Sequence, residues 1–372
     1  MVDVRLNEIQ KSYQGKLVVS DLNMHVQDGE YVVLLGASGC GKTSVLKIIA
    51  GLESPDQGDI FLGQQRITGL APRKRDIAMV FQDDALYPHM TVRKLIGFAL
   101  ARKLSTADLK QRIDDAVAMT NIELLLDRMP ENLSGGESRR VAIAKAMARR
   151  ASVRLLDEPL SGLDANVRGG IQDALLHWHR KTPGTTIHVT HDGQEAMRVA
   201  DRIAVMDQGK IVQFAAPSEI YHQPATKTVA LAIGSPPMNF LPVQVRNGKV
   251  CFQSKNAEVV SAIDIPESVA SEIQVGFRDR FVQVVADDES ISRPGILLTG
   301  TLLKQQALDG RCRLSVELDA QTRVNATQEK QTTKIQGESI RLFWALEHLM
   351  FFDSRSGENL TGCDSTGQSP SD

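Results

Sequence analysis

Apolar residues recur with two different kinds of spacing along this 372-residue chain. Up to about residue 235, short apolar runs of strand length alternate with segments whose apolar residues recur every three to four positions. The strand-like runs are YVVLLG at 31–36, TTIHVT at 185–190 and RIAVM at 202–206. The helix-like segments include TSVLKIIAGL at 43–52 and ADLKQRIDDAVAMT at 107–120, whose expected apolar face is Leu109, Ile113, Ala116 and Val117. This alternation predicts an α/β fold.

After SPPMNFLP at 235–242, apolar and polar residues alternate with a period of two. VQVRNGKVCF alternates around Asn247-Gly248, which predicts a β-hairpin. RCRLSVEL at 311–318 follows an Asp309-Gly310 turn, and IRLFW at 340–344 is a further half-buried strand. We therefore expect a small all-β domain, sandwich or barrel, over residues 236–361. The polar residues 362–372 are expected to be disordered.

Composition narrows the class of protein. The chain is 42% hydrophobic and 24% charged with a formal net charge of -2, typical of a soluble globular protein and unlike a nucleic-acid binder. Its four cysteines have no paired spacing, which argues against a disulfide or zinc framework. The N-terminus, MVDVRLNEIQKSY, has no apolar signal region, and no apolar run approaches the ~20 residues of a membrane helix. We expect a cytoplasmic protein that reaches a membrane only through a partner.

The segment GASGCGKT at 36–43 has the spacing of a phosphate-binding loop. An apolar strand precedes it and a helix follows it, so its backbone N–H groups can surround an anion at a helix N-terminus. Lys42 is expected to reach the β- and γ-phosphates, and Thr43 to give its hydroxyl to Mg²⁺. The alternative is a glycine-rich turn that binds nothing.

VRLLDEP at 153–159 predicts a buried strand that ends in two acids. Asp157 would hold Mg²⁺ through water, and Glu158 would polarise an attacking water. The alternative is that both acids are solvated surface charge. Arg154 is unusual inside such a strand, because a buried charge needs a partner. We expect it to reach the surface or to find an acid.

LSGGE at 133–137 starts a second predicted helix, SRRVAIAKAMARR. Ser134, Gly135 and Gly136 could hold another anion at this helix start. The simpler interpretation, a glycine-rich N-cap in which Ser134 caps the helix, is compatible with the first.

These motifs, together with MVFQ at 79–82, SGLD at 161–164 and VTH at 189–191, stand in one order along the chain. In that order they resemble the ATP-binding cassette of ABC transporters, from about residue 3 to 240. The resemblance implies an α/β P-loop NTPase, an ABC ATPase cassette, over residues 1–235 with a helical subdomain at about 88–150. It implies an OB-like (TOBE/MOP-like) character for the β-rich domain.

The resemblance assigns a role to residues in each motif. Glu158 would be the general base, His191 a γ-phosphate sensor, and Gln82 a contact to Mg²⁺ and the attacking water. The metal ligands would be Thr43, Gln82 and Asp157. Contacts to ATP would come from Tyr13, Val18, Gly36, Ala37, Ser38, Gly39, Cys40, Gly41, Lys42, Thr43, Ser44, Gln82, Asp157, Asp164 and His191, and in a twofold dimer from Ser134, Gly135, Gly136 and Glu137 of the second copy.

Several of these residues have simpler interpretations. Tyr13 could be a core or surface tyrosine, Gln82 an ordinary surface residue, and His191 a structural residue at a strand end. Asp164 could cap a helix, which is compatible with a role at the dimer contact.

Four further segments resemble the ATPase subunits of carbohydrate importers, the type that handles maltose, other oligosaccharides or glycerol 3-phosphate. They are LYPHMTV at 86–92, THDGQEAM at 190–197, ADRIAVMDQGKI at 200–211 and GSPPMNFL at 234–241. HLMFFDSRSG at 348–357 is similar to the closing strand and turn of their extra β domain, which could also be purely structural.

This resemblance implies a homodimer at the cytoplasmic face of the inner membrane. The dimer would sit beneath two membrane permeases, with an indirect link to an extracytoplasmic solute-binding protein and a regulatory protein at the C-terminal domain. Two alternatives stay open: the same machine with polyamine, sulfate or iron as its cargo, and a soluble ABC ATPase that does not transport.

Three positions depart from the family pattern. Asp84 replaces an aromatic residue just after the glutamine motif, and VGFRDR at 275–280 lacks the usual R-P-E pattern. Glu137 stands where glutamine is commonest, so its carboxylate is expected to weaken dimer closure around a γ-phosphate unless Arg139, Arg140 or solvent offsets the charge.

Overall fold

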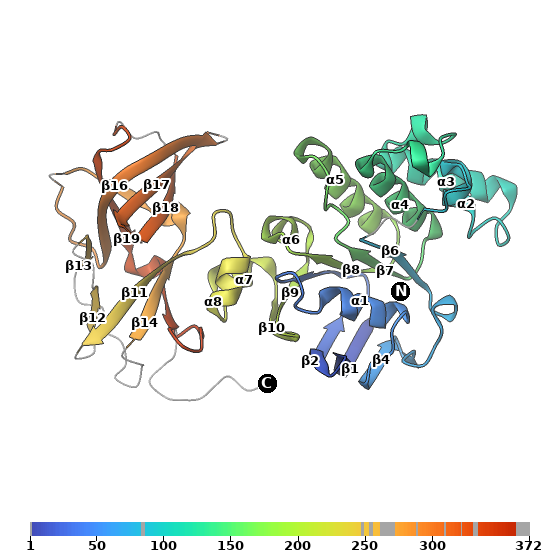
Figure 1. Ribbon diagram of the computed structural model, residues 1–372, viewed down its shortest axis with the longest axis horizontal. Coiled ribbons are helices and arrows are strands. Elements are labelled where there is room, and N and C mark those ends of the chain that lie inside the picture. The colour runs from blue at the N-terminus through green and yellow to red at the C-terminus, as the bar shows by residue number, and fades with distance from the viewer. Residues whose placement is uncertain are drawn as a thin grey trace. The chain divides into compact units, whose positions relative to one another are not determined.

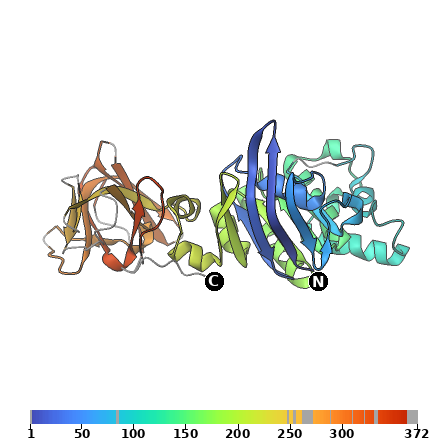
Figure 2. The same cartoon turned by 90° about the horizontal axis from the view of Figure 1, so that it is seen from below.

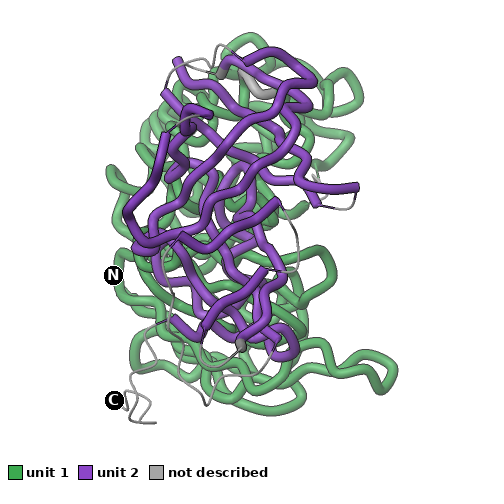
Figure 3. Tube along the Cα trace, turned by 90° about the vertical axis from the view of Figure 1, so that its left-hand side faces the viewer, with its two compact units in different colours: residues 1–220 green, residues 221–372 purple. Residues whose placement is uncertain are grey.

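The computed structural model of the protein forms two compact units (Figures 1 and 3), residues 1–220 and residues 221–372. The residues that it describes are 2–82, 86–246, 249–252, 256–260, 272–287, 289–308, 310–320, 322–329 and 334–361. The predicted hairpin turn at 247–248, the predicted disordered tail at 362–372 and the Asp84 departure lie outside them. The domain boundary at 235/236 stays a prediction, since the two units divide earlier, after Ile220.

A six-stranded, mostly parallel sheet forms the centre of the first unit. Strands β6, β7, β8, β3 and β9 are parallel neighbours, and β10 closes the sheet antiparallel to β9. Every residue of β3 is buried, as a continuous apolar run in a parallel sheet requires. The predicted strands at 31–36, 185–190 and 202–206 are confirmed. The six strands are β3 (Tyr31–Leu35), β6 (Ile77–Val80), β7 (Val153–Asp157), β8 (Thr185–Thr190), β9 (Arg202–Asp207) and β10 (Lys210–Ala215).

A second sheet in this unit is antiparallel, and its long strands are drawn in dark blue in Figure 2. Apolar residues from this sheet, from helix α1 and from the central sheet form one continuous core. The predicted helix at 43–52 is confirmed as α1 (Lys42–Ala50), which ends at Gly51 in the left-handed conformation. The strands are β1 (Val4–Tyr13), β2 (Lys16–Val26), β4 (Gln57–Leu62) and β5 (Gln65–Arg66).

Helices α2, α3 and α4 pack against one another at one end of the first unit (Figure 1). Helix α3 begins where the Ser105 side chain accepts a hydrogen bond from Asp108 N, and it ends at Asn121 in the left-handed conformation. Its predicted apolar face is confirmed, although Leu109 is only half-buried. The helices of the unit are α2 (Val92–Gly97), α3 (Thr106–Thr120), α4 (Gly135–Arg149), α5 (Ala165–Lys181) and α6 (Gly193–Val199).

The second unit is rich in antiparallel strands, as its period-two sequence predicts. Two sheets, ordered β12-β11-β14-β20 and β15-β19-β16-β17-β18, share one apolar core that contains Trp344. In Figure 2 the strands of this unit wrap around a common interior. The strands are β11 (Asn239–Arg246), β12 (Lys249–Phe252), β13 (Ala257–Val260), β14 (Glu272–Phe277), β15 (Gln283–Val285), β16 (Gly295–Leu308), β17 (Arg311–Asp319), β18 (Thr322–Gln328), β19 (Ser339–Ala345) and β20 (Leu349–Asp353).

A buried arginine explains why this unit begins before residue 235. Arg278, just after β14, donates hydrogen bonds to the carbonyl oxygens of Ala230, Ile233 and Tyr221, at 3.0, 2.6 and 3.2 Å. These contacts fasten α8 (Lys227–Ala232) and the end of α7 (Pro217–His222) to the β-rich core. No helix in the described part of the chain is long and apolar enough to cross a membrane.

Candidate functional site

The loop at 36–41 joins the end of β3 to the start of α1, where a phosphate loop is expected. Gly41 has a φ of 108°, and a Cβ there would lie 2.7 Å from the carbonyl oxygen of Val18, so only glycine fits. Lys42 is buried, and its Nζ donates to the carbonyl oxygens of Gly36 and Ala37 at 2.8 Å each. Ala37, Ser38 and Gly39 are exposed, Cys40 is buried, and Ser44 lies half-buried in the first turn of α1.

The N-terminal end of α1, at Thr43, meets the C-terminal end of β7, at Asp157. Thr43 Oγ1 donates to Asp157 Oδ1 at 3.0 Å. Asp157 is 2% exposed, and burial raises the pKa of its carboxyl, although the Thr43 hydrogen bond acts in the opposite direction. A partly buried hydroxyl–carboxylate pair beside a phosphate loop offers the hard oxygen ligands that Mg²⁺ prefers. The donor set therefore fits Mg²⁺, with further ligands to come from phosphate and water.

Glu158 and His191 extend the site along the same edge of the sheet. His191 Nδ1 lies 3.3 Å from Glu158 Oε1, so the predicted base and the predicted γ-phosphate sensor are brought into contact. Glu158 has a left-handed φ of 46°, unusual for a residue with a side chain, and its N–H donates to Val189 O of β8 at 2.9 Å. Its carbonyl accepts hydrogen bonds from the N–H and the hydroxyl of Ser161, which continue the turn.

The residues predicted to surround adenine come from the antiparallel sheet. Tyr13, at the end of β1, is 37% exposed, and its hydroxyl contacts Ser44 Oγ at 3.3 Å and the carboxylate of Glu53. Val18 of β2 is half-buried and its carbonyl faces Gly41. Tyr13 and Val18 therefore both lie beside the phosphate loop, and Tyr13 is not a core residue.

The LSGGE segment forms a reciprocal cap at the start of α4. Glu137 N donates to Ser134 Oγ at 3.3 Å, and Ser134 N donates to Glu137 Oε2 at 2.8 Å. This backbone hydrogen bond and the nearby Arg128, whose Nη1 is 3.5 Å from Glu137 Oε1, lower the pKa of the Glu137 carboxyl. Gly135 is exposed, and a Cβ on Gly136 would touch Leu163 at 3.4 Å. The helix-cap interpretation of Ser134 is confirmed.

Arg139, which the sequence suggests only as a counter-charge to Glu137, connects three of the motifs. It lies on α4, is 5% exposed, and donates to the carbonyl oxygens of Phe81 at 2.6 Å and Gln82 at 2.5 Å. Its Nη2 is also 3.4 Å from Ser161 Oγ. The sequence did hold a signal for this role. Arg139 lies five positions after Ser134 and falls on the buried face of the predicted helix, where a charged residue needs partners.

Arg139 positions the segment that carries Gln82. Asp164 follows the turn that contains Ser161. Gln82 is exposed, and the residues that follow it, 83–85, lie outside the described part of the chain. Asp164 stands at the N-cap of α5, where its carbonyl accepts from Val167 N and Arg168 N, but its side chain makes no capping hydrogen bond. Its exposed carboxylate therefore has no capping role in this structure.

A buried polar chain supports the strand that carries His191. Tyr31 Oη contacts His188 Nδ1 at 2.9 Å, and His188 Nε2 lies 3.0 Å from Glu195 Oε1. Thr190 Oγ1 donates to Glu195 Oε2 at 2.8 Å and accepts from Asp192 N. Burial raises the pKa of the Glu195 carboxyl, but the contacts with His188 and Thr190 outweigh it, so the net pKa is lowered. The chain anchors both residues that flank His191, and the sequence offered no clear signal for it.

Arg154 differs from both sequence expectations, since it neither reaches the surface nor finds an acid. It is fully buried in β7, and its Nη2 donates to the carbonyl oxygens of Thr182 at 2.7 Å and Pro183 at 2.9 Å. Its Cζ lies 4.3 Å from the ring centroid of Trp178. Burial lowers the pKa of Arg154 to about 10. Carbonyl oxygens and an aromatic face replace the expected carboxylate, because a guanidinium can be satisfied by either.

A parallel sheet with a glycine-rich loop after β3 and acids after β7 defines a P-loop nucleotide-binding protein. The ABC transporter family matches residues 19–161. The sn-glycerol-3-phosphate import ATP-binding protein UgpC of Paracoccus denitrificans is 36% identical over 363 residues, which cover 97% of this chain and 100% of the relative. The sulfoquinovosyl glycerol transport ATP-binding protein SmoE of Agrobacterium fabrum is 44% identical over 264 residues, which cover 71% of this chain and 74% of the relative.

Solved structures match the cassette. The dimeric post-hydrolysis state of the ATP-binding cassette MJ0796 bound to ADP and Pi has a TM-score of 0.54 and 27% identity, covering 57% of this chain and 98% of that chain. The chain belongs to the ABC transporter ATP-binding protein family. It has the ABC ATPase cassette fold and binds and hydrolyses ATP.

Proposed function

We propose that this chain is the ATPase subunit of an importer for a sugar or a sugar-phosphate-like solute. The observation that carries the catalytic part is the pair of contacts at one edge of the sheet, Thr43 with Asp157 and Glu158 with His191. Thr43 lies in the first turn of the helix after the phosphate loop, and Glu158 follows Asp157 directly, which supports placing a hydroxyl, two acids and a histidine around the γ-phosphate.

Each side chain has a distinct part in the proposed reaction. Lys42 and His191 neutralise the γ-phosphate, and Glu158 orients the attacking water and accepts its proton. Thr43, Asp157 and Gln82 would hold Mg²⁺, which would neutralise phosphate charge when bound. His191, as a hydrogen-bond partner of Glu158, keeps that carboxylate turned toward the phosphate.

The LSGGE segment is proposed to act on a second copy of the chain. Ser134 and Gly135 are exposed at the N-terminus of α4, so their backbone N–H groups can meet a γ-phosphate carried by another subunit. The similar solved cassette is dimeric, which supports a homodimer. We further infer that the dimer works beneath membrane permeases at the cytoplasmic face, and that the β-rich unit is OB-like and has a regulatory or dimerisation role.

The names of the two relatives, one for sn-glycerol-3-phosphate import and one for sulfoquinovosyl glycerol transport, support a sugar-type solute over polyamine, sulfate or iron. The test deletes the gene in the source organism and measures uptake of labelled maltose, sn-glycerol 3-phosphate, putrescine, sulfate and ferric iron. Restoring the wild-type gene should recover uptake of one sugar or sugar phosphate, whereas restoring Glu158→Gln should not. Loss of putrescine, sulfate or iron uptake, with uptake of both sugar-type solutes unchanged, would contradict the proposed cargo.

A further inference from the structure

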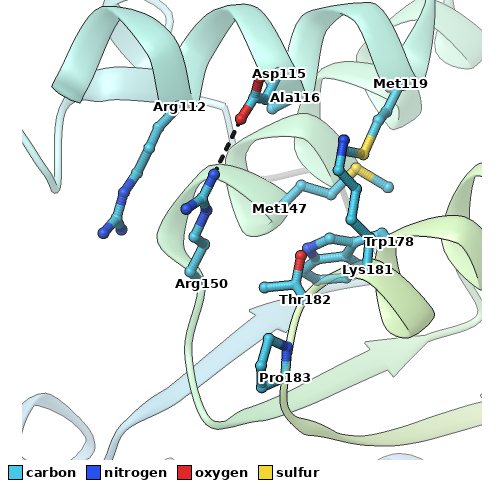
Figure 4. Close-up of a pocket in the computed structure, with 10 residues that line it drawn as sticks. All are labelled: Arg112, Asp115, Ala116, Met119, Met147, Arg150, Trp178, Lys181, Thr182 and Pro183. Carbon is cyan, nitrogen blue, oxygen red and sulfur yellow. Dashed lines mark hydrogen bonds and ion pairs between the residues drawn. The ribbon is translucent and has the colours of Figure 1, made fainter. Parts of the chain in front are cut away.

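A second cavity lies in the first unit, at the opposite ends of the helices that carry the site motifs. Its volume is about 440 Å³, within the range of small-molecule sites. Its walls come from α3, from the C-terminal ends of α4 and α5, and from the loop between α5 and β8 (Figure 4). The cavity lining includes Arg112, Met119, Met147, Arg150, Trp178 and Lys181.

The charge around this cavity is positive. Arg112, Arg150 and Lys181 line it together with one acid, Asp115, and that acid is already paired with Arg150 Nη2 at 3.0 Å. Within the described residues, the side chains of Arg112 and Lys181 have no hydrogen bond or ion pair. Two cations from different walls therefore offer uncompensated donors to an anion.

The floor of the cavity provides a buried donor without a partner. Trp178 is 2% exposed, and its Nε1–H has no hydrogen-bond acceptor among the described residues. In Figure 4 the indole nitrogen faces the side of the cavity that carries Arg150. An unmet N–H in a buried tryptophan is costly, and an oxygen atom of a ligand would satisfy it.

The remaining wall is apolar and sulfur-rich. Met119 and Met147 face the cavity beside the indole, and Lys181 extends along Met119 toward α3 (Figure 4). Thioethers and an indole suit a flat ring, because both are polarisable. Behind the indole, the buried guanidinium of Arg154 adds a further positive charge 4.3 Å from the ring.

We propose that this cavity binds a small organic anion consisting of one planar ring and an oxyanion group, either carboxylate or phosphate. The ring packs against Trp178, Met119 and Met147. The oxyanion accepts hydrogen bonds from Arg112 and Lys181 and from the Trp178 N–H. This site is separate from the phosphate loop and does not depend on which solute is imported.

Two helices connect this cavity with the nucleotide site. Helix α4 starts at the LSGGE cap and is about 22 Å long, and Arg150 follows its last residue. Helix α5 starts after Asp164, and Trp178 and Lys181 lie in its last turn. A ligand in the cavity therefore contacts the far ends of both helices whose first turns carry the proposed dimer contacts.

The test titrates the full-length protein with four probes in saturating ADP and Mg²⁺, which block the phosphate loop. The probes 4-nitrobenzoate and 4-nitrophenyl phosphate carry both ring and oxyanion; 4-nitrobenzyl alcohol lacks the charge, and inorganic phosphate lacks the ring. Calorimetry should show one site per chain with a Kd below about 1 mM for at least one ring-bearing anion. The tighter of the two anions identifies the head group.

Variants then locate the binding. Arg112→Gln should weaken binding by about 10-fold or more, while Arg149→Gln, the same charge change on a neighbouring exposed residue outside the cavity, should not. Trp178 and Trp344 are the two tryptophans, so in the Trp344→Phe protein the nitro ring should quench Trp178 emission directly. Should Trp344→Phe not fold, the quenching is measured in the wild type.

Three results would overturn the proposal: no binding of either ring-bearing anion, equal affinity for the neutral alcohol, or equal weakening by Arg112→Gln and Arg149→Gln. Binding that Arg112→Gln weakens selectively supports it, whether or not uptake of any solute is later assigned. A failure here leaves the proposed importer function intact, because none of these variants touches the phosphate loop.

Discussion

Asp157 and Glu158 are adjacent acids in very different surroundings. The Asp157 carboxyl is enclosed next to Thr43, so its ionised form loses contact with water and its pKa rises. Glu158 is turned by its backbone toward His191 at the edge of the sheet. One acid is thus placed to hold a cation and the other to handle a proton, although both follow the same strand.

Replacing Glu158 by glutamine removes the proposed base and keeps its size. We expect Glu158→Gln to bind Mg-ATP with unchanged affinity and to hydrolyse it at least ~100-fold more slowly, because general-base help of that size is lost. Equilibrium binding and single-turnover hydrolysis check this. Glu131→Gln, on an exposed residue before LSGGE, is the control, and wild-type turnover by Glu158→Gln would remove Glu158 from the role.

Replacing Asp157 by asparagine should separate stability from activity. An acid whose pKa is higher in the folded state than in the unfolded state destabilises the fold as pH rises through the window above its unfolded pKa of about 3.9. At neutral pH Asp157→Asn should therefore unfold at a higher temperature than wild type without Mg²⁺, and this advantage should shrink as pH falls toward 4. Hydrolysis should drop by ~10–100-fold, because Asp157 is proposed to hold Mg²⁺ through water. A lower unfolding temperature at neutral pH would show that ionised Asp157 stabilises the chain.

At the scale of elements, α4 links the motifs. Its first turn is the LSGGE cap, and Arg139, near its start, holds the carbonyls of Phe81 and Gln82 and reaches Ser161. A shift of this helix would therefore move the glutamine segment and the turn after Glu158 together. These contacts join three segments that are far apart in the sequence.

Arg139→Met should uncouple these segments while preserving the length of the side chain. Each lost hydrogen bond involves a charged donor, so we expect kcat for ATP hydrolysis to fall by about 10-fold or more, with a smaller change in KM. Arg140→Met is the matched control, since Arg140 Nη1 donates instead to Asn121 O. Equal losses in both variants would assign the effect to helix stability rather than to the segments that Arg139 holds.

Glu137→Gln should leave ATPase activity unchanged or modestly higher. Glutamine can make the same reciprocal cap with Ser134, and it removes a negative charge near the proposed γ-phosphate contact. Glu137→Ala, which loses the cap, should destabilise α4 by about 1 kcal/mol. A large activity loss in Glu137→Gln, measured beside the Glu137→Ala protein, would mean that the carboxylate makes a specific contact across the dimer.

At the scale of the whole molecule, each unit has its own apolar core and one tryptophan. Trp178 belongs to the first unit and Trp344 to the second, where its Nε1 donates to Arg278 O. Fluorescence can therefore follow the unfolding of each unit separately in Trp178→Phe and Trp344→Phe proteins.

Arg278→Met should destabilise only the second unit. It removes three charged hydrogen bonds that fasten α7 and α8 to β14, so the unfolding seen by Trp344 should shift by about 2 kcal/mol or more. The transition seen by Trp178 should stay in place. Arg280→Met, whose guanidinium only stacks near Tyr221 at 5.6 Å, is the control. A shift of the Trp178 transition would show that the two units unfold together.

The sequence predicted the strands, helices and motif positions well, because buried strands such as β3 and capped helices such as α4 are encoded by neighbouring residues. It could not predict contacts between segments distant in sequence. Arg139 with Gln82, Arg154 with Thr182 and Trp178, and Arg278 with α8 all pair a guanidinium with backbone carbonyls. Carbonyls carry no sequence signature, so Arg154 was expected to reach the surface or an acid, whereas the fold supplies backbone carbonyls.

The left-handed backbone of Glu158 has a consequence for how this position can change over time. Glycine adopts that backbone without the cost of about 1–2 kcal/mol that a Cβ brings. A single nucleotide change converts a glutamate codon into a glycine codon, so a residue with less backbone strain at this position is one mutation away. Selection for stability alone would favour glycine there, and only selection for the carboxylate opposes it. In a homologous copy that no longer hydrolyses ATP, glycine at position 158 should therefore be tolerated and should stabilise this turn.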